Sequence, residues 1–178
     1  MKIAILGWGS LLWEGGQEFD KRHDTPWRLD GPTLKIEFSR KSTSRQGALT
    51  LVIDDQHGSP TTVAWCLSTR QNVEDAICDL RCREGTAAKN IECALATEGQ
   101  KPIAAWAGQR SVDAVIWTAL KSNFGESFSV ETAIAYVNTL DSCGKAKAAE
   151  YVRRAPVFVK TPLRDALQRE PWFLTIPF

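Results

Sequence analysis

The hydrophobic positions in the first third of the chain follow two patterns that are typical of β-strands. Residues 3–6 form a continuous apolar run, which predicts a strand buried on both faces. Apolar and polar residues alternate over residues 34–39 and again over residues 49–53, which predicts two strands with one buried face each. Residues 62–67 follow a turn sequence and predict another strand. We therefore expect residues 34–67 to form an antiparallel meander.

After Asn72, the spacing of apolar residues changes from alternate positions to the three- and four-residue spacing of a helix, and asparagine is a residue type that caps helices. Gly85 predicts the end of this helix, because glycine readily adopts the left-handed conformation found at helix termini. Between them, four side chains recur at helical spacing and share one face: Val73, Ile77, Leu80 and Glu84. The pattern therefore predicts an amphipathic helix whose apolar face ends in a carboxylate.

The second half of the chain combines both kinds of element. Strands are expected at residues 102–107 and 114–120, and helices at residues 130–140, at residues 145–154 and from Pro162 onward. No linker, repeat or low-complexity segment interrupts them. A chain of 178 residues is long enough for one well-buried domain and short for two, so a single domain formed by residues 1–178 is expected.

Composition and charge exclude several classes of function. The chain has 22 basic and 21 acidic residues, a net charge of +1 and no long basic run, so nucleic-acid binding is not expected. No apolar stretch is long enough for a membrane span or has the features of a secretory signal, which predicts a cytosolic protein. The 5 cysteines are an odd number, which suits a reducing compartment. Cys78 and Cys82 stand four residues apart on the expected helix, either as ordinary thiols or as metal ligands, and the lack of a nearby histidine favours thiols.

The glycine-rich sequence Gly7-Trp8-Gly9-Ser10 follows the first strand directly and offers backbone amides to an anion. Such a loop suits a nucleotide phosphate, the oxyanion of an acyl-transfer reaction, or a substrate carboxylate. A dinucleotide-binding loop requires Gly or Ala at position 12, where this chain has Leu12. A nucleophilic serine would need glycines at positions 8 and 12 and a histidine partner, and neither condition is met. The 2 histidines also give little support to a metal-dependent hydrolase.

Glu84 is unusual because it continues the apolar face of its expected helix. It also lies in the last turn, where the negative end of the helix dipole disfavours a carboxylate. A carboxyl group whose charged form is disfavoured suits a general base that must later return its proton. The alternative is that the helix frays before Gly85 and Glu84 pairs with Arg81 or Arg83 at the surface.

Together the two motifs resemble the γ-glutamylcyclotransferase superfamily, most nearly its ChaC-like and AIG2-like branch. That family carries Gly-Tyr-Gly-Ser-Leu-Ile/Val-Trp after its first strand, and residues 7–13 here read Gly-Trp-Gly-Ser-Leu-Leu-Trp. It also carries a catalytic Glu at the end of the helix after its central strands, which matches Leu80-x-x-Arg83-Glu84-Gly85. The polar segment 40–46 is, taken alone, either a solvated connection or a contact for a substrate carboxylate, and its residues 42–45 have a counterpart in the family.

The resemblance implies an α+β fold, namely a small mixed, mainly antiparallel β-barrel flanked by helices. It implies that the α-amine of a γ-glutamyl substrate attacks its own γ-carbonyl, which releases 5-oxoproline and an amine or peptide, as in glutathione metabolism. No metal or organic cofactor is required. Glu84 would be the general acid/base. The substrate-binding residues would be Gly7, Trp8, Gly9, Ser10, Leu11 and Leu12.

Two departures from the family pattern keep other functions open. Trp8 replaces the family's Tyr and removes a hydroxyl that could bind substrate, and Arg81 replaces an acidic neighbour of the catalytic Glu. One alternative is a non-catalytic small-molecule-binding protein that retains the fold. Another is a deprotecting cyclotransferase that acts on a γ-glutamyl biosynthetic intermediate. The leaving amine and the oligomeric state are not specified by the sequence.

Overall fold

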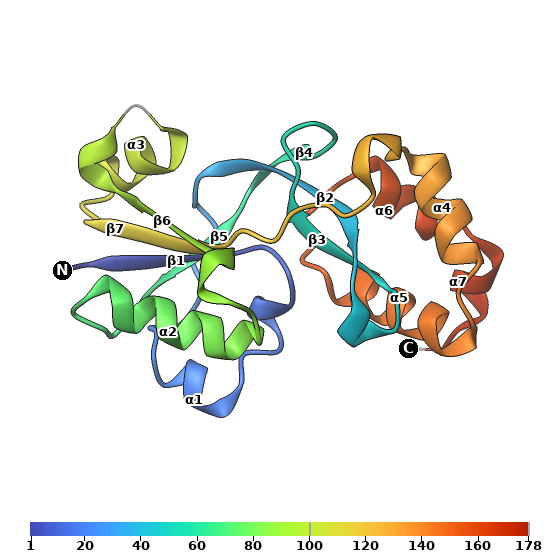
Figure 1. The fold of residues 1–178 in the computed structure, drawn as a ribbon, viewed down its shortest axis with the longest axis horizontal. Coiled ribbons are helices and arrows are strands. Elements are labelled where there is room, and N and C mark those ends of the chain that lie inside the picture. The colour runs from blue at the N-terminus through green and yellow to red at the C-terminus, as the bar shows by residue number, and fades with distance from the viewer. Residues whose placement is uncertain (100, 178) are drawn as a thin grey trace. The chain divides into compact units, whose positions relative to one another are not determined.

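The protein is described from a computed structural model that covers residues 1–99 and 101–177 (Figure 1). Its internal contacts divide the chain into two compact units, each built from two stretches of sequence. The first unit consists of Met1–Thr33 and Thr62–Leu120, and the second of Leu34–Thr61 and the chain from Lys121 onward. The single domain expected from the sequence stays a prediction.

The first unit contains a mixed four-stranded sheet in the order β5-β1-β7-β6. Its strands are β1 (Ile3–Gly7), β5 (Ala64–Leu67), β6 (Ile91–Leu95) and β7 (Ala114–Thr118). β1 pairs antiparallel with β5 and parallel with β7, and β6 pairs antiparallel with β7. Every residue of β1 is buried, which confirms the strand predicted from its continuous apolar run.

Three helices belong to this unit: α1 (Gln17–Asp20), α2 (Val73–Glu84) and α3 (Pro102–Gln109). α2 and α3 both contact β6 and β7, and they lie on opposite sides of the sheet (Figure 1). Helices on both faces explain why β1 and β7 are apolar at successive positions. On the α2 side the core includes Ile3, Ile5, Leu11, Phe19, Ala76, Leu80 and Ile116.

The strand expected at residues 102–107 is wrong, because these residues form α3. Pro102 occupies the start of the helix, where its missing N–H costs no hydrogen bond. Alanine is the strongest helix former, and the segment contains several alanines. Trp106 is buried here, and its indole N–H donates to the carbonyl oxygen of Asp30 at 3.2 Å.

The second unit contains a three-stranded sheet in the order β3-β2-β4. Its strands are β2 (Thr33–Lys41), β3 (Leu49–Ile53) and β4 (Ser59–Thr62), and β2 and β3 pair antiparallel as expected. The rest of the expected meander is wrong, because residues 62–67 do not form one strand beside β3. β4 pairs with β2, whereas β5 joins the other sheet. The chain leaves the ladder between them at Val63, whose amide donates to Pro32 O and whose carbonyl accepts from Gly31 N.

Four helices complete the second unit: α4 (Val130–Asn138), α5 (Ser142–Arg154), α6 (Pro162–Leu167) and α7 (Pro171–Thr175). The three helices predicted after residue 129 are confirmed. α5 begins earlier than expected, because Asp141 caps it by accepting a hydrogen bond from Gly144 N at 2.7 Å. α5 packs near β3, where Tyr151 meets Phe38 edge to face at a ring distance of 6.2 Å.

The fold is therefore α+β, but the closed barrel implied by the resemblance is wrong for the described part of the chain. Its strands form one sheet of four strands and one of three, each with two open edges. A barrel requires the first and last strands of one sheet to pair, and β5 and β6 do not. Over residues 1–99 and 101–177, no helix has the length and apolarity that a membrane crossing requires.

Candidate functional site

The glycine-rich segment forms a tight turn at the end of β1. Leu12 N donates to Gly9 O at 3.0 Å, and Ser10 O accepts from Trp13 N at 3.1 Å and from Glu14 N at 2.7 Å. These bonds close a short 3₁₀ helix over Ser10–Leu12. Because Leu12 is the first donor within this turn, the amides of Ser10 and Leu11 have no acceptor inside it. This is the local geometry that an anion-binding segment requires.

Most of this segment is buried. Gly7 and Gly9 are buried, Trp8 is 5% exposed and Leu11 is 7% exposed. Leu11 belongs to the apolar core beneath α2, so it can meet a substrate only through its backbone. Ser10 and Leu12 are half-buried and are the positions of this segment at which side chains reach solvent. The six residues stay predicted substrate-binding residues, and the geometry favours contacts through the main chain.

Close packing explains why residue 7 is a glycine. A Cβ atom at this position would lie 2.9 Å from Leu12 Cδ2 and 3.0 Å from Trp27 Cζ3. The side chains of Leu12 and Trp27 therefore cover Gly7, and a larger residue would displace them. Gly9 has φ −128°, a value open to other residues, so its backbone conformation does not require glycine.

Gly7→Ala is expected to lower the free energy of unfolding by about 1–3 kcal/mol, because the added methyl overpacks the contact with Leu12 and Trp27. Thermal and urea unfolding measure this change. Gly108→Ala is the matched control, because a Cβ there meets nothing within 4 Å and alanine favours helix α3. Equal stability of the two variants would contradict the packing explanation.

Glu84 lies at the end of a helix with a well-defined terminus. Asn72 caps α2 by accepting a hydrogen bond from Asp75 N at 2.8 Å. At the other end Gly85 is left-handed (φ 58°), Gly85 N donates to Cys82 O, and Thr86 N donates to Arg81 O. These two bonds form a Schellman motif. The helix predicted from the apolar period is confirmed, and it does not fray before Gly85.

The Glu84 side chain is 16% exposed and pairs with its neighbour Arg83, with Arg83 Nη1 2.8 Å from Glu84 Oε1. The same guanidinium donates from Nε to Gly15 O at 3.3 Å and from Nη2 to Glu14 O. The sequence left two expectations for Glu84, an inward-facing carboxylate and a surface pair with an arginine, and the structure contains part of each. The carboxylate continues the helix face that contains Leu80, and it also forms an ion pair, which is largely shielded from solvent.

Arg81, the other arginine considered for Glu84, contacts a cysteine. Its Nη2 lies 3.9 Å from Cys78 Sγ, on an exposed part of α2. In the described ranges, the five cysteines are free and no three His, Cys, Asp or Glu side chains lie together as a metal site requires. Arg45, from the polar segment 40–46, stacks over the Tyr151 ring at 5.1 Å, which gives it a packing contact in the second unit.

A buried carboxylate in the second unit is not predicted by the sequence. Glu37, on the central strand β2, is 1% exposed. Its Oε1 accepts hydrogen bonds from Phe38 N and from the Thr161 hydroxyl, both at 2.7 Å. Burial raises the pKa of Glu37 to about 7, helped by the charge of Asp54 and opposed by the two hydrogen bonds.

Asp54 differs from Glu37 although it is also buried. Burial alone would raise the pKa of Asp54, but the Ser39 hydroxyl, the His57 amide and the His57 ring outweigh it and lower the pKa. His57 N donates to Asp54 Oδ1 at 3.0 Å. Ser39 Oγ and Asp54 Oδ2 are shielded from solvent, and neither forms a hydrogen bond of normal geometry with the described residues.

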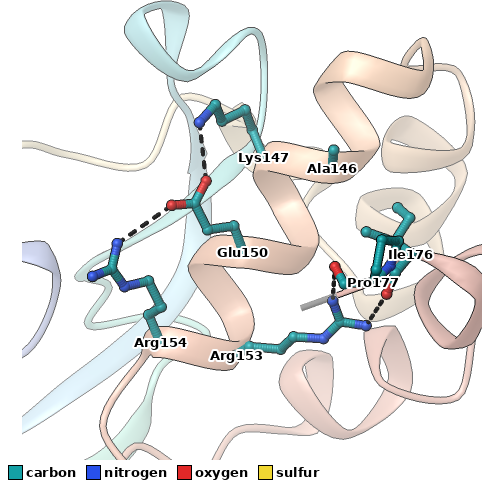
Figure 2. A pocket seen from close by; sticks show the side chains of 7 residues that line it. All are labelled: Ala146, Lys147, Glu150, Arg153, Arg154, Ile176 and Pro177. Atoms are coloured by element: carbon teal, nitrogen blue, oxygen red, sulfur yellow. Dashed lines mark hydrogen bonds and ion pairs between the residues drawn. The ribbon is translucent and has the colours of Figure 1, made fainter.

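A cavity of about 390 Å³ lies on the second unit, between α5 and the segment that follows α7. In Figure 2, Lys147 and Arg154 point toward Glu150, at 2.9 and 3.4 Å. Arg153 donates to the carbonyl oxygens of Ile176 at 2.7 Å and Pro177 at 3.1 Å. The cavity contains none of the residues predicted to bind substrate. Its cations are engaged by the protein itself, so it gives no independent indication of a ligand.

Comparison with known proteins gives no match to this chain among protein-family models, curated proteins or solved structures. The candidate site therefore depends on the local geometry and on the resemblance of the two short motifs.

Proposed function

We propose that this chain is a γ-glutamylcyclotransferase-like enzyme that converts a γ-glutamyl compound into 5-oxoproline and a free amine or peptide. In this proposal Glu84 is the general acid/base. Within residues 8–12, the amides of Ser10 and Leu11, which the turn itself does not use, bind the substrate carboxylate or the developing oxyanion. The deprotecting form of the reaction, on a biosynthetic intermediate, uses the same chemistry with a different leaving amine.

One observation carries the proposal. Arg83 contacts Glu84 and also the carbonyl oxygens of residues 14 and 15, which follow the glycine-rich turn directly. The guanidinium thus links the end of α2, which carries Glu84, to the segment that follows the glycine-rich turn, although the two are far apart in sequence. A catalytic acid/base and an anion-binding turn must lie near each other for one substrate to reach both.

The reaction needs only proton transfer and orientation. The α-ammonium of the substrate must lose a proton before its nitrogen attacks the γ-carbonyl carbon, and a carboxylate at Glu84 accepts it. The C–N bond to the leaving group then breaks, and Glu84 returns its proton to the departing nitrogen. The second proton that the α-nitrogen loses on becoming the lactam nitrogen also passes to the departing amine, which leaves as an ammonium. Folding of the glutamyl chain into attack geometry makes the step unimolecular.

The test is a panel of γ-glutamyl dipeptides, γ-glutamyl amines and glutathione, with 5-oxoproline measured by mass spectrometry. The expected result is 5-oxoproline from at least one γ-glutamyl member, with α-glutamyl dipeptides unchanged as the matched control. An α-linked dipeptide lacks the γ-amide that the amine attacks. No product from any member would contradict the proposal.

The ion pair of Glu84 supports a second candidate, a non-catalytic binding protein. Arg83 Nη1 lies 2.8 Å from Glu84 Oε1, so the carboxylate that would act on a substrate is already engaged by the protein itself. This candidate is favoured if 5-oxoproline or a γ-glutamyl dipeptide raises the melting temperature while the panel yields no product.

A further inference from the structure

Arg83 is placed to control the orientation of Glu84. Its side chain is 9% exposed, and three of its nitrogens donate to three different oxygen atoms, on Glu84, Glu14 and Gly15. A guanidinium is planar and always charged, so contacts at three nitrogens fix both its position and its plane. The Glu84 oxygen that it binds is fixed with it.

The pair between Arg83 and Glu84 is not a consequence of the helix itself. Adjacent residues on a helix point in different directions and do not normally face each other. Here the two carbonyl oxygens at residues 14 and 15 hold the Arg83 guanidinium against the end of α2, where it meets Glu84. Arg83 therefore connects the segment after the glycine-rich turn to the Glu84 carboxylate.

We infer that Arg83 is a positioning residue that orients the Glu84 carboxylate and couples it to the backbone of residues 14 and 15. This inference deepens the proposed function and rests on it. It separates two effects of Arg83. The fork of donors sets the direction of the carboxylate, whereas the positive charge alone attracts the carboxylate without fixing its direction.

Two substitutions separate these effects. Arg83→Lys keeps the charge and loses the fork, whereas Arg83→Gln loses both. Arg81→Gln is the matched control, because Arg81 is on the same turn and contacts Cys78. With the γ-glutamyl compound that the wild type converts, Arg83→Gln is expected to lower kcat by about 10- to 100-fold.

Arg83→Lys is expected to lower kcat by a smaller factor, with KM little changed in both variants. Arg81→Gln should keep the kcat of the wild type. The inference is overturned if Arg83→Gln matches Arg81→Gln in kcat. If Arg83→Gln fails to fold, the comparison of Arg83→Lys with Arg81→Gln decides the question through kcat.

Hydrogen exchange of the wild type and the same variants separates failure of this inference from failure of the proposed function. If the wild type forms no 5-oxoproline, the proposed function fails. Hydrogen exchange still measures the contact between Arg83 and the backbone of residues 14 and 15, because it does not depend on turnover. Arg83→Gln should then increase amide exchange over residues 14–16 relative to Arg81→Gln, because the guanidinium no longer holds these carbonyl groups. Equal exchange in the two variants overturns the link.

Discussion

Replacing Glu84 with Gln is expected to reduce kcat/KM for 5-oxoproline release by about 100- to 10,000-fold, the usual range for removal of a general acid/base. Glutamine has nearly the same shape and can still accept the hydrogen bond from Arg83 Nη1 through its amide oxygen. It cannot accept a proton from the α-ammonium. The loss should therefore appear in kcat, with substrate binding largely kept.

The control for this substitution is Glu74→Gln, which makes the same change in the exposed first turn of α2. Both variants should show the circular dichroism spectrum of the wild type. Glu74→Gln should also keep the wild-type rate, because Glu74 lies at the other end of the helix from Glu84. Turnover that survives Glu84→Gln would eliminate Glu84 as the general acid/base.

The elements near the candidate site were predictable because their signals are local. β1 follows from its apolar run, and the end of α2 follows from Gly85, whose left-handed conformation closes the helix within a few residues. The partner of Glu84 was not predictable. The sequence offers both Arg81 and Arg83 as partners for Glu84. In the fold, the carbonyl groups of residues 14 and 15 bind the Arg83 guanidinium and so favour Arg83.

Strand pairing was harder to predict because it depends on residues far apart. β1 pairs in parallel with β7, which lies beyond the part of the chain that carries the family resemblance. The connection at Val63 sends β5 to the first sheet, and no periodic pattern marks that change. The barrel implied by the resemblance was wrong for this reason, although the α+β class was right.

The alternation of apolar and polar residues on β2 does not give the burial of its polar side chains. The alternation over residues 34–39 predicted that Glu37 and Ser39 face solvent, yet both are buried. Glu37 still pairs in regular register with Val52, and its side chain is covered by Thr161, whose hydroxyl donates to it. Between the pairs Glu37–Val52 and Arg40–Thr50 the register shifts, so β2 has one more residue than β3 over this stretch.

The burial of Glu37 leads to an expected pH dependence of stability. Its pKa is about 7 in the folded protein against an ordinary value of 4.5. Between these two pH values the unfolded chain releases the proton while the folded protein retains it, so the folded state becomes less stable as the pH rises. At about 1.4 kcal/mol per pH unit, the loss accumulates to about 3 kcal/mol and then levels off above pH 7.

Glu37→Gln removes this loss, because glutamine carries no proton to release and its amide oxygen can still accept from Phe38 N and Thr161 Oγ1. The free energy of unfolding of Glu37→Gln minus that of the wild type should therefore rise by about 3 kcal/mol between pH 4.5 and 7 and stay level above it. Urea unfolding at fixed pH values measures the difference, and the subtraction cancels the effects of groups that do not interact with Glu37. Asp54 is not one of these groups, because its charge contributes to the raised pKa of Glu37. Glu150→Gln is the matched control, because hydrogen bonding to Lys147 lowers the pKa of Glu150, which places its effect at lower pH. Parallel curves for the wild type and Glu37→Gln over this range would mean that the Glu37 carboxyl is already ionised in the folded protein.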